Sequence, residues 1–132
     1  MAWLSRCLLV GPNLCMVMSQ REYEKALKER GIEYDGAQWL PDGCKAMVVS
    51  ILDNEHGELF CIVCVHPDAL NADGIDVAAS MAHESVHVWQ RVKRHTSYDD
   101  PDKCWGTEAE AYAIENIFRN LMMEMQRRRE AK

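Results

Sequence analysis

The chain has 132 residues, of which 48% are hydrophobic and 27% are charged, a balance typical of one globular domain with an apolar core. Its formal net charge of -6 at pH 7 excludes the basic surface by which most proteins bind phosphate backbones. We therefore expect a single domain over 1–132 that does not bind nucleic acid. No run approaches the roughly 18 consecutive apolar residues of a membrane helix, so we also expect no membrane span and a cytoplasmic protein.

The first half of the chain predicts a strand, a helix and a β-hairpin. The apolar residues 14–18 favour a short strand, and Ser19 then has the character of an N-cap for a charged helix that ends at a glycine. Two β-rich runs follow at 46–52 and 59–66. The polar segment between these runs suits a turn, so we expect an antiparallel hairpin.

The second half predicts two helices. One long helix extends from about residue 73 to residue 93, and a last helix extends from about Thr107 to Arg128. Three consecutive arginines at 127–129 lie near the end of the last helix, where positive charge is favoured by the helix dipole, and we interpret them in that way. The order of elements, β-α, β-β, α, α, predicts one α+β domain.

The six cysteines are interpreted as reduced thiols, because a chain with this much apolar residue needs no disulfide scaffold. Cys61 and Cys64 have the spacing of a metal-binding pair, but they lie within a predicted strand. Side chains three positions apart on a strand point to opposite faces of the sheet. We therefore predict that these two cysteines are buried apolar residues that do not share a metal ion.

The long helix carries the sequence His83-Glu84-Ser85-Val86-His87, which matches the HExxH pattern. Positions i and i+4 lie one turn apart on the same helix face, so the two imidazoles can bind one zinc ion. Glu84 then lies beside the metal, where it can act as general base and take a proton from a zinc-bound water. The motif therefore predicts a zinc-dependent hydrolase.

The periodicity of the same helix separates the motif from the predicted core. Its apolar residues fall in one broad arc that we expect to face the core: Ile75, Ala78, Met81, Ala82, Val86, Val88, Trp89 and Val92. The opposite arc holds the motif with other polar side chains: Asp76, Ser80, His83, Glu84, His87, Arg91 and Arg94. This arrangement disfavours an interpretation of the two histidines as core residues.

A catalytic zinc site with two histidines needs a third protein ligand and an open position for water. The last helix begins with two candidate carboxylates, Glu108 and Glu110. Glu108 follows His87 at a distance that allows a loop to bring the last helix back antiparallel to the long one. Glu110 is nearer to the apolar stripe of its helix, so we expect it to be the more buried of the two. The periodicity leaves both candidates open.

The HExxH sequence at 83–87, followed by Glu108-Ala109-Glu110-Ala111, resembles the gluzincin class of zinc metallopeptidases. The stretches 82–90 and 110–114 are most similar to short metallopeptidase-like proteins encoded by bacteriophages and prophages. The resemblance covers roughly residues 47–122. It implies a minimal zincin-like domain, in which a small antiparallel sheet or hairpin packs on the HExxH helix and a C-terminal helix follows.

The resemblance also implies site residues and a substrate class. Carried over by motif, the first glutamate of the E-x-E-A pattern is the third ligand, so Glu108 is favoured and Glu110 is the alternative. Many gluzincins have Asp or Asn four residues after the ligand glutamate, whereas this chain has Tyr112, whose hydroxyl could orient a histidine or stabilise an oxyanion. The implied substrate is a peptide or protein along the hairpin edge, and the implied location is the host cytoplasm if a phage encodes the chain.

Three functions are compatible with these features. The first is a metallopeptidase in which Zn²⁺ polarises the scissile carbonyl and Glu84 deprotonates the water. The second is a zinc-binding interaction module of zincin fold that contacts a host protein with little or no hydrolysis, since 132 residues leave little material for a deep specificity pocket. The third is a hydrolase of a non-peptide amide or ester. Two histidines and a carboxylate also suit Fe(II), and zinc is the preferred ion.

Overall fold

Three strands form one sheet in the order β1-β3-β2. The computed structural model describes residues 3–4, 13–53, 58–95 and 107–131, except for the side chains of 53 and 107–109. β1 (Asn13–Val17) pairs in parallel with β3 (Glu58–Val65), and β2 (Ala46–Asp53) pairs antiparallel with β3. β3 is therefore the central strand, and every residue after its first is buried.

The β2–β3 hairpin confirms the predicted antiparallel hairpin, but the sheet as a whole is mixed rather than the small antiparallel sheet that the resemblance allowed, because β1 joins it in parallel. A parallel pair requires a crossover connection, and α1 (Gln20–Glu29) with the loop after it lies on the path from β1 back into the sheet. α1 begins at the predicted N-cap, where the Ser19 hydroxyl accepts a hydrogen bond from the Glu22 N–H at 3.1 Å.

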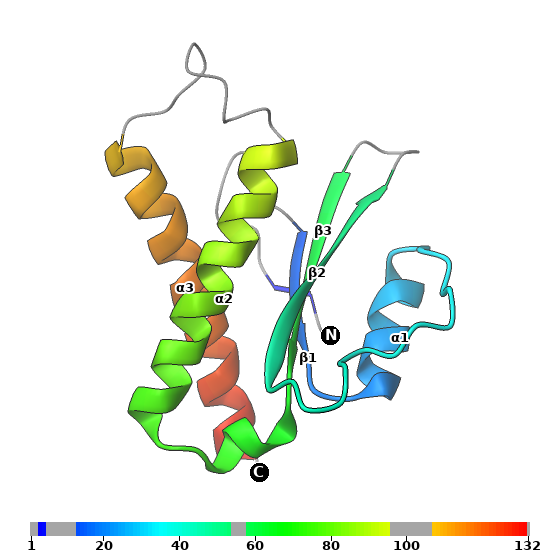
Figure 1. Ribbon diagram of the computed structural model, residues 1–132, viewed down its shortest axis with the longest axis horizontal. Helices are drawn as coiled ribbons and strands as arrows, with labels where there is room; N and C mark the ends of the chain where they lie inside the picture. Colours follow the sequence, from blue (N-terminus) through cyan, green and yellow to red (C-terminus); the bar gives the residue numbers. More distant parts are fainter. Residues whose placement is uncertain (1–2, 5–12, 54–57, 96–106, 132) are drawn as a thin grey trace.

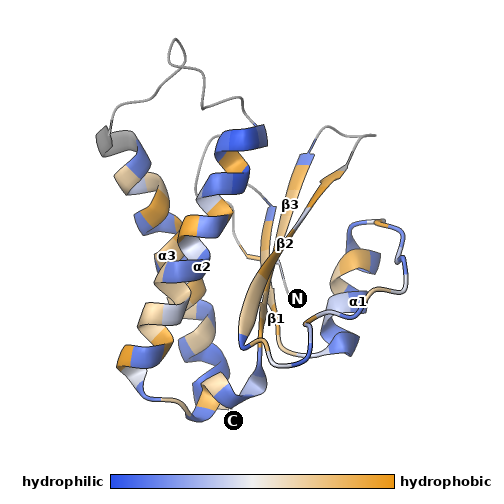
Figure 2. Ribbon diagram, viewed as in Figure 1, coloured by the Kyte–Doolittle hydropathy of each residue, from blue (hydrophilic) through white to orange (hydrophobic). Residues whose placement is uncertain are grey.

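Helices cover both faces of the sheet (Figure 1). α2 (Gly74–His95) and α3 (Thr107–Ala131) lie side by side on one face, and α1 lies on the other. A short 3-10 helix, η1 (Pro67–Asn71), which the sequence did not predict, connects β3 to α2. Figure 2 shows the strands mainly in hydrophobic colours, whereas the helices alternate between hydrophilic and hydrophobic colours. None of the helices in the described part of the chain is long and apolar enough to cross a membrane.

The two outer edges of the sheet differ. The outer edge of β1 is covered, because Trp3 forms an antiparallel bridge with Cys15 and the Leu4 N–H donates to the Leu14 carbonyl at 2.8 Å. β2 pairs with β3 alone, so within the described residues its other edge has no strand partner. An uncovered edge presents backbone donors and acceptors to any extended chain that approaches it. The open edge is on the side of the sheet where β2 passes α2.

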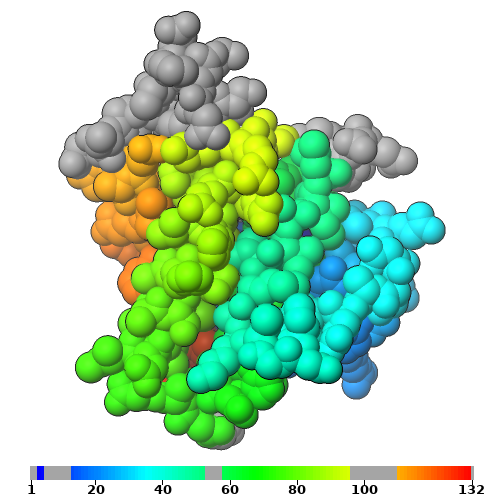
Figure 3. Space-filling model, in the orientation of Figure 1, coloured from blue at the N-terminus to red at the C-terminus, as the bar shows by residue number. Residues whose placement is uncertain are grey.

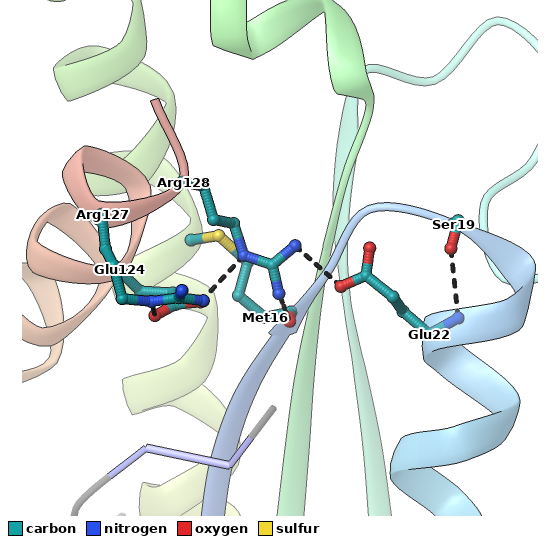
Figure 4. A network of polar contacts seen from close by, with 6 residues as sticks. All are labelled: Met16, Ser19, Glu22, Glu124, Arg127 and Arg128. Atoms are coloured by element: carbon teal, nitrogen blue, oxygen red, sulfur yellow. Dashed lines mark hydrogen bonds and ion pairs between the residues drawn. The ribbon is translucent and has the colours of Figure 1, made fainter. Parts of the chain in front are cut away.

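Arg128 ties the end of α3 to the sheet and to α1 (Figure 4). Its Nε donates to Glu124 Oε2 at 2.8 Å, its Nη2 donates to the Met16 carbonyl at 2.9 Å, and its Nη1 lies 2.7 Å from Glu22 Oε1. Burial acts to raise the pKa of the Glu124 carboxyl, but hydrogen bonds from Arg127 and Arg128 outweigh it and hold this pKa below its usual value. Arg128 therefore acts as a specific connection between three elements, beyond the favourable dipole interaction that the sequence predicted.

Replacing Arg128 by alanine should lower the free energy of unfolding by about 2–4 kcal/mol, because it leaves the buried Glu124 carboxylate and the Met16 carbonyl with fewer donors. Urea unfolding followed by circular dichroism measures the change. The matched control is Arg119→Ala, which removes an exposed pair with Glu115 on the same helix and should cost less than about 0.5 kcal/mol. Equal losses in the two variants would contradict a structural role for Arg128.

Candidate metal centre

α2 is rotated about its axis relative to the hydropathy prediction. Its buried residues are Val77, Met81, Glu84, Ser85, Val88, Trp89 and Val92. The predicted core arc was wrong at Ile75, Ala82 and Val86, which face solvent, and the placement of Glu84 in the accessible arc was wrong as well, since Glu84 is 5% exposed. The reason is that α2 packs against the sheet and α3 at once, and the side chains that fill both contacts fix its rotation.

The two motif histidines lie at the surface and face each other. His83 and His87 are exposed, as the sequence predicted, and their Nε2 atoms are 3.1 Å apart. Two nitrogens that share a tetrahedral zinc ion at about 2.0–2.1 Å lie about 3.3 Å apart. Without a metal, the same separation allows one imidazole N–H to donate to the other ring. The pair is therefore already close to the spacing at which both nitrogens bind one ion.

Gln90 orients the second histidine. Its side-chain carbonyl Oε1 lies 2.9 Å from Nδ1 of His87. Because a carbonyl oxygen only accepts, this contact favours the tautomer in which Nδ1 of His87 carries the proton and Nε2 keeps its lone pair. Histidines that bind metals commonly have such a partner on the other ring nitrogen, because it sets both the tautomer and the ring orientation.

Glu84 lies between the two histidines in sequence but points into the protein. Its Oε2 is buried and has no hydrogen-bond partner among the described residues. Burial raises the pKa of the Glu84 carboxyl, while the nearby His83 and His87 act to lower it. A buried carboxylate oxygen without a donor is costly, and such groups are frequent where a carboxyl takes part in proton transfer. The donor set therefore fits a metal held by the histidines with a carboxyl beside it that can accept a proton.

A pocket of about 240 Å³ opens between α2 and β2 over this motif. It is lined by Ala46, Met47, Val48, His83, Glu84, His87 and Arg91. Figure 3 shows the same face, with the surface of α2 next to that of β2. The pocket thus places the histidine pair and the Glu84 carboxyl opposite the first residues of the uncovered strand.

The hydrogen-bond register of the hairpin identifies which backbone groups of β2 face this side. The His66 N–H donates to the Lys45 carbonyl at 2.8 Å, and the pairing continues as Ala46↔Val65 and Met47↔Cys64. Along a strand of an antiparallel pair, residues whose backbone N–H and C=O groups bond to the partner strand alternate with residues whose groups point away from it. The backbone N–H and C=O groups that point away from β3 therefore belong to Ala46, Val48, Ser50 and Leu52.

The structure gives side-chain contacts for only one of the two candidate third ligands. Glu110 Oε1 accepts a hydrogen bond from Trp89 Nε1 at 3.3 Å and lies 3.3 Å from Lys93 Nζ, so it is held at the contact between α2 and α3. Glu108 is in α3, but its side chain lies outside the described residues. Within the described residues, no three His, Cys, Asp or Glu side chains gather as a metal site. Tyr112, the residue that departs from the gluzincin pattern, is 60% exposed.

The CxxC pair behaves as the sequence predicted. Cys61 belongs to the core that faces α2, and Cys64 belongs to the core that faces α1, so the two thiols lie on opposite sides of the sheet. Burial is the main cause that raises the pKa of each of these thiols to about 12. Protonated, separated thiols do not bind a metal ion together. The described cysteines Cys15, Cys44, Cys61 and Cys64 form no disulfide.

Two residues of the site received no specific role from the sequence. Gln90 belonged only to the stretch 82–90, and Arg91 belonged only to the polar arc of the helix. The i, i+3 spacing of His87 and Gln90 is nevertheless a signal for a side-chain contact on a helix. Arg91 could be linked to the pocket only once β2 was in position.

Comparisons with known proteins found no matching family model, no matching curated protein and no matching solved structure.

Replacing Gln90 by alanine should weaken zinc binding about tenfold or more, because it removes the acceptor that holds His87 in its metal-binding tautomer. Zinc titration in competition with a chromophoric chelator measures the affinity, and His83→Ala provides the reference for loss of a ligand. Gln126→Ala, the same change on the surface of α3, serves as the matched control and should leave the affinity unchanged. Identical affinities for wild type and Gln90→Ala would refute the orienting role.

Proposed function

We propose that this protein is a zinc-dependent peptidase with a minimal zincin-like domain. The observation that carries the proposal is the 3.1 Å separation of the His83 and His87 Nε2 atoms beside the buried Glu84 carboxyl, whose Oε2 has no hydrogen-bond partner among the described residues. Helix geometry explains the spacing of the imidazoles, and the Gln90 contact explains the tautomer. The pocket against an uncovered strand adds a place for an extended substrate.

His83 and His87 would hold the metal, with Glu108 favoured as third ligand and Glu110 as the alternative. A zinc ion at this position supplies Lewis acidity, which lowers the pKa of a water molecule and polarises a carbonyl. Glu84 accepts the proton from the attacking water at its carboxyl oxygen and returns it to the leaving amine. Its burial supports this role, because a carboxyl whose pKa is raised holds a proton more readily than an exposed one.

The substrate is proposed to bind as an added strand along β2. Outward backbone groups of Ala46 and Val48 lie at the pocket, and an extended peptide can pair with them by main-chain hydrogen bonds. Such pairing is largely independent of side chains, so it positions a peptide bond over the histidine pair without a deep cavity. This mode of binding favours a peptide over a small amide or ester.

A second function is favoured by one observation. The pocket of about 240 Å³ is smaller than the roughly 300–1,000 Å³ of most small-molecule sites. A shallow pocket suits a zinc-binding interaction module, in which the metal holds the structure together and hydrolysis is slight or absent. The two functions share the metal ligands and differ in the need for Glu84 as a base.

Replacing Glu84 by glutamine separates the two functions. For a peptidase, hydrolysis should fall by at least about a hundredfold while zinc content is unchanged, because the base is lost and the ligands are kept. A mixed-sequence peptide pool incubated with the zinc-loaded protein and analysed by mass spectrometry gives the rates, with Glu115→Gln as a control on the surface of α3. Undiminished hydrolysis in Glu84→Gln would exclude Glu84 as base, and a zinc-loaded wild type that cleaves nothing would favour the interaction module.

Zinc content of the purified variants should identify the third ligand. We expect about one zinc per chain in the wild type, by plasma mass spectrometry, and its loss in His83→Ala and Glu108→Ala. Glu110→Ala should keep the metal, because Glu110 is bound to Trp89 and Lys93. Loss of zinc in Glu110→Ala with retention in Glu108→Ala would reverse the assignment. A wild type that neither contains nor takes up zinc would exclude the proposed function.

A further inference from the structure

Arg91 is a positive charge in the pocket that the proposed chemistry does not use. It lies one turn after His87 on α2 and lines the pocket with the two histidines and Glu84. The residue is half-buried, yet its guanidinium forms no hydrogen bond or ion pair with any residue that the structure describes. A guanidinium carries five N–H donors, so a half-buried arginine without acceptors leaves much of its binding capacity unused.

The other half-buried arginines of the described chain, Arg128 and Arg129, differ in this respect. Arg128 is bound to two carboxylates and a backbone carbonyl, and Arg129 Nη2 donates to the Ala72 carbonyl at 3.2 Å. Arg91 is also not paired with Glu84, the acidic group that shares its pocket. Arg91 therefore lines the pocket with donors that no described residue binds.

The position of Arg91 along α2 determines how far its charge lies from the histidine pair. Arg91 is four positions after His87, which corresponds to a rise of about 6 Å along the helix axis. An extended chain advances about 3.3 Å per residue, so this distance corresponds to roughly two residues of a peptide that follows β2. A group bound by Arg91 would thus lie about two residues from the peptide bond over the histidine pair.

We propose that Arg91 binds a carboxylate of the substrate, about two residues from the bond that faces His83 and His87. The planar guanidinium matches a carboxylate through two parallel hydrogen bonds, which makes the recognition specific for this group. The carboxylate is either the C-terminus of a peptide or the side chain of Asp or Glu. This inference rests on the proposed function, because it assumes that a peptide lies along β2.

Equilibrium binding of N-terminally labelled, mixed-sequence hexapeptide pools tests the proposal by fluorescence anisotropy. One pool ends in a free carboxylate and its partner ends in a carboxamide, and a second pair, both carboxamides, carries a fixed central Glu or Gln. Wild type, Arg91→Gln and Arg94→Gln are compared with and without added zinc. Arg94 is an exposed arginine on the same helix, so its variant removes an equal charge outside the pocket. Thermal unfolding verifies that each variant is folded.

Wild type and Arg94→Gln should bind one carboxylate pool about tenfold or more tightly than its neutral partner, and Arg91→Gln should bind both alike. The pair that shows the difference identifies the source of the carboxylate, and its persistence without zinc excludes binding by the metal. Equal binding of all pools by wild type, or a preference that survives in Arg91→Gln, would overturn the proposal. Hydrolysis without a carboxylate preference would leave the peptidase proposal standing, whereas Arg91-dependent binding without hydrolysis would count against the peptidase alone.

Discussion

The packing of α2 between the sheet and α3 is the constraint on which the candidate site depends. Met81, Val88 and Val92 are fully or almost fully buried and fill the space that α2 shares with its neighbours. Because these contacts fix the rotation of the helix, they also fix what lies on its side toward β2. His83 and His87 reach the surface there. Glu84 follows His83 in the sequence and lies about 100° from it around the helix axis, where it is buried at the rim of the core.

The two outer edges of the sheet differ, and the candidate site lies at the edge formed by β2. The edge at β1 is occupied by the N-terminal segment and by Arg128, whose guanidinium binds the Met16 carbonyl. Within the part of the chain that the structure describes, the edge at β2 has no strand partner, and its first residues line the pocket with the histidine pair. An edge without a strand partner can pair with an extended chain, and the proposed binding of a peptide along β2 relies on this property.

The burial of Glu84 costs stability at the candidate site. Its Oε2 has no donor among the described residues, which costs free energy in the folded state, and the raised pKa of this carboxyl has the same cause, its burial. Favourable free energy elsewhere comes from the buried apolar residues of this core and from the ion pair of Arg128 with Glu124. Costly groups of this kind are expected at functional positions rather than in purely structural ones.

The sequence alone determined the features that depend on local geometry: the element boundaries to within a few residues, the shared helix face of His83 and His87, and the opposite faces of Cys61 and Cys64. These follow from the periods of helix and strand, which need no neighbours. The tertiary structure decided the parallel pairing of β1, the burial of Glu84 and the position of Arg91 in a pocket. Each of these depends on which distant surface packs on the element, and hydropathy along one chain segment carries no information about that partner.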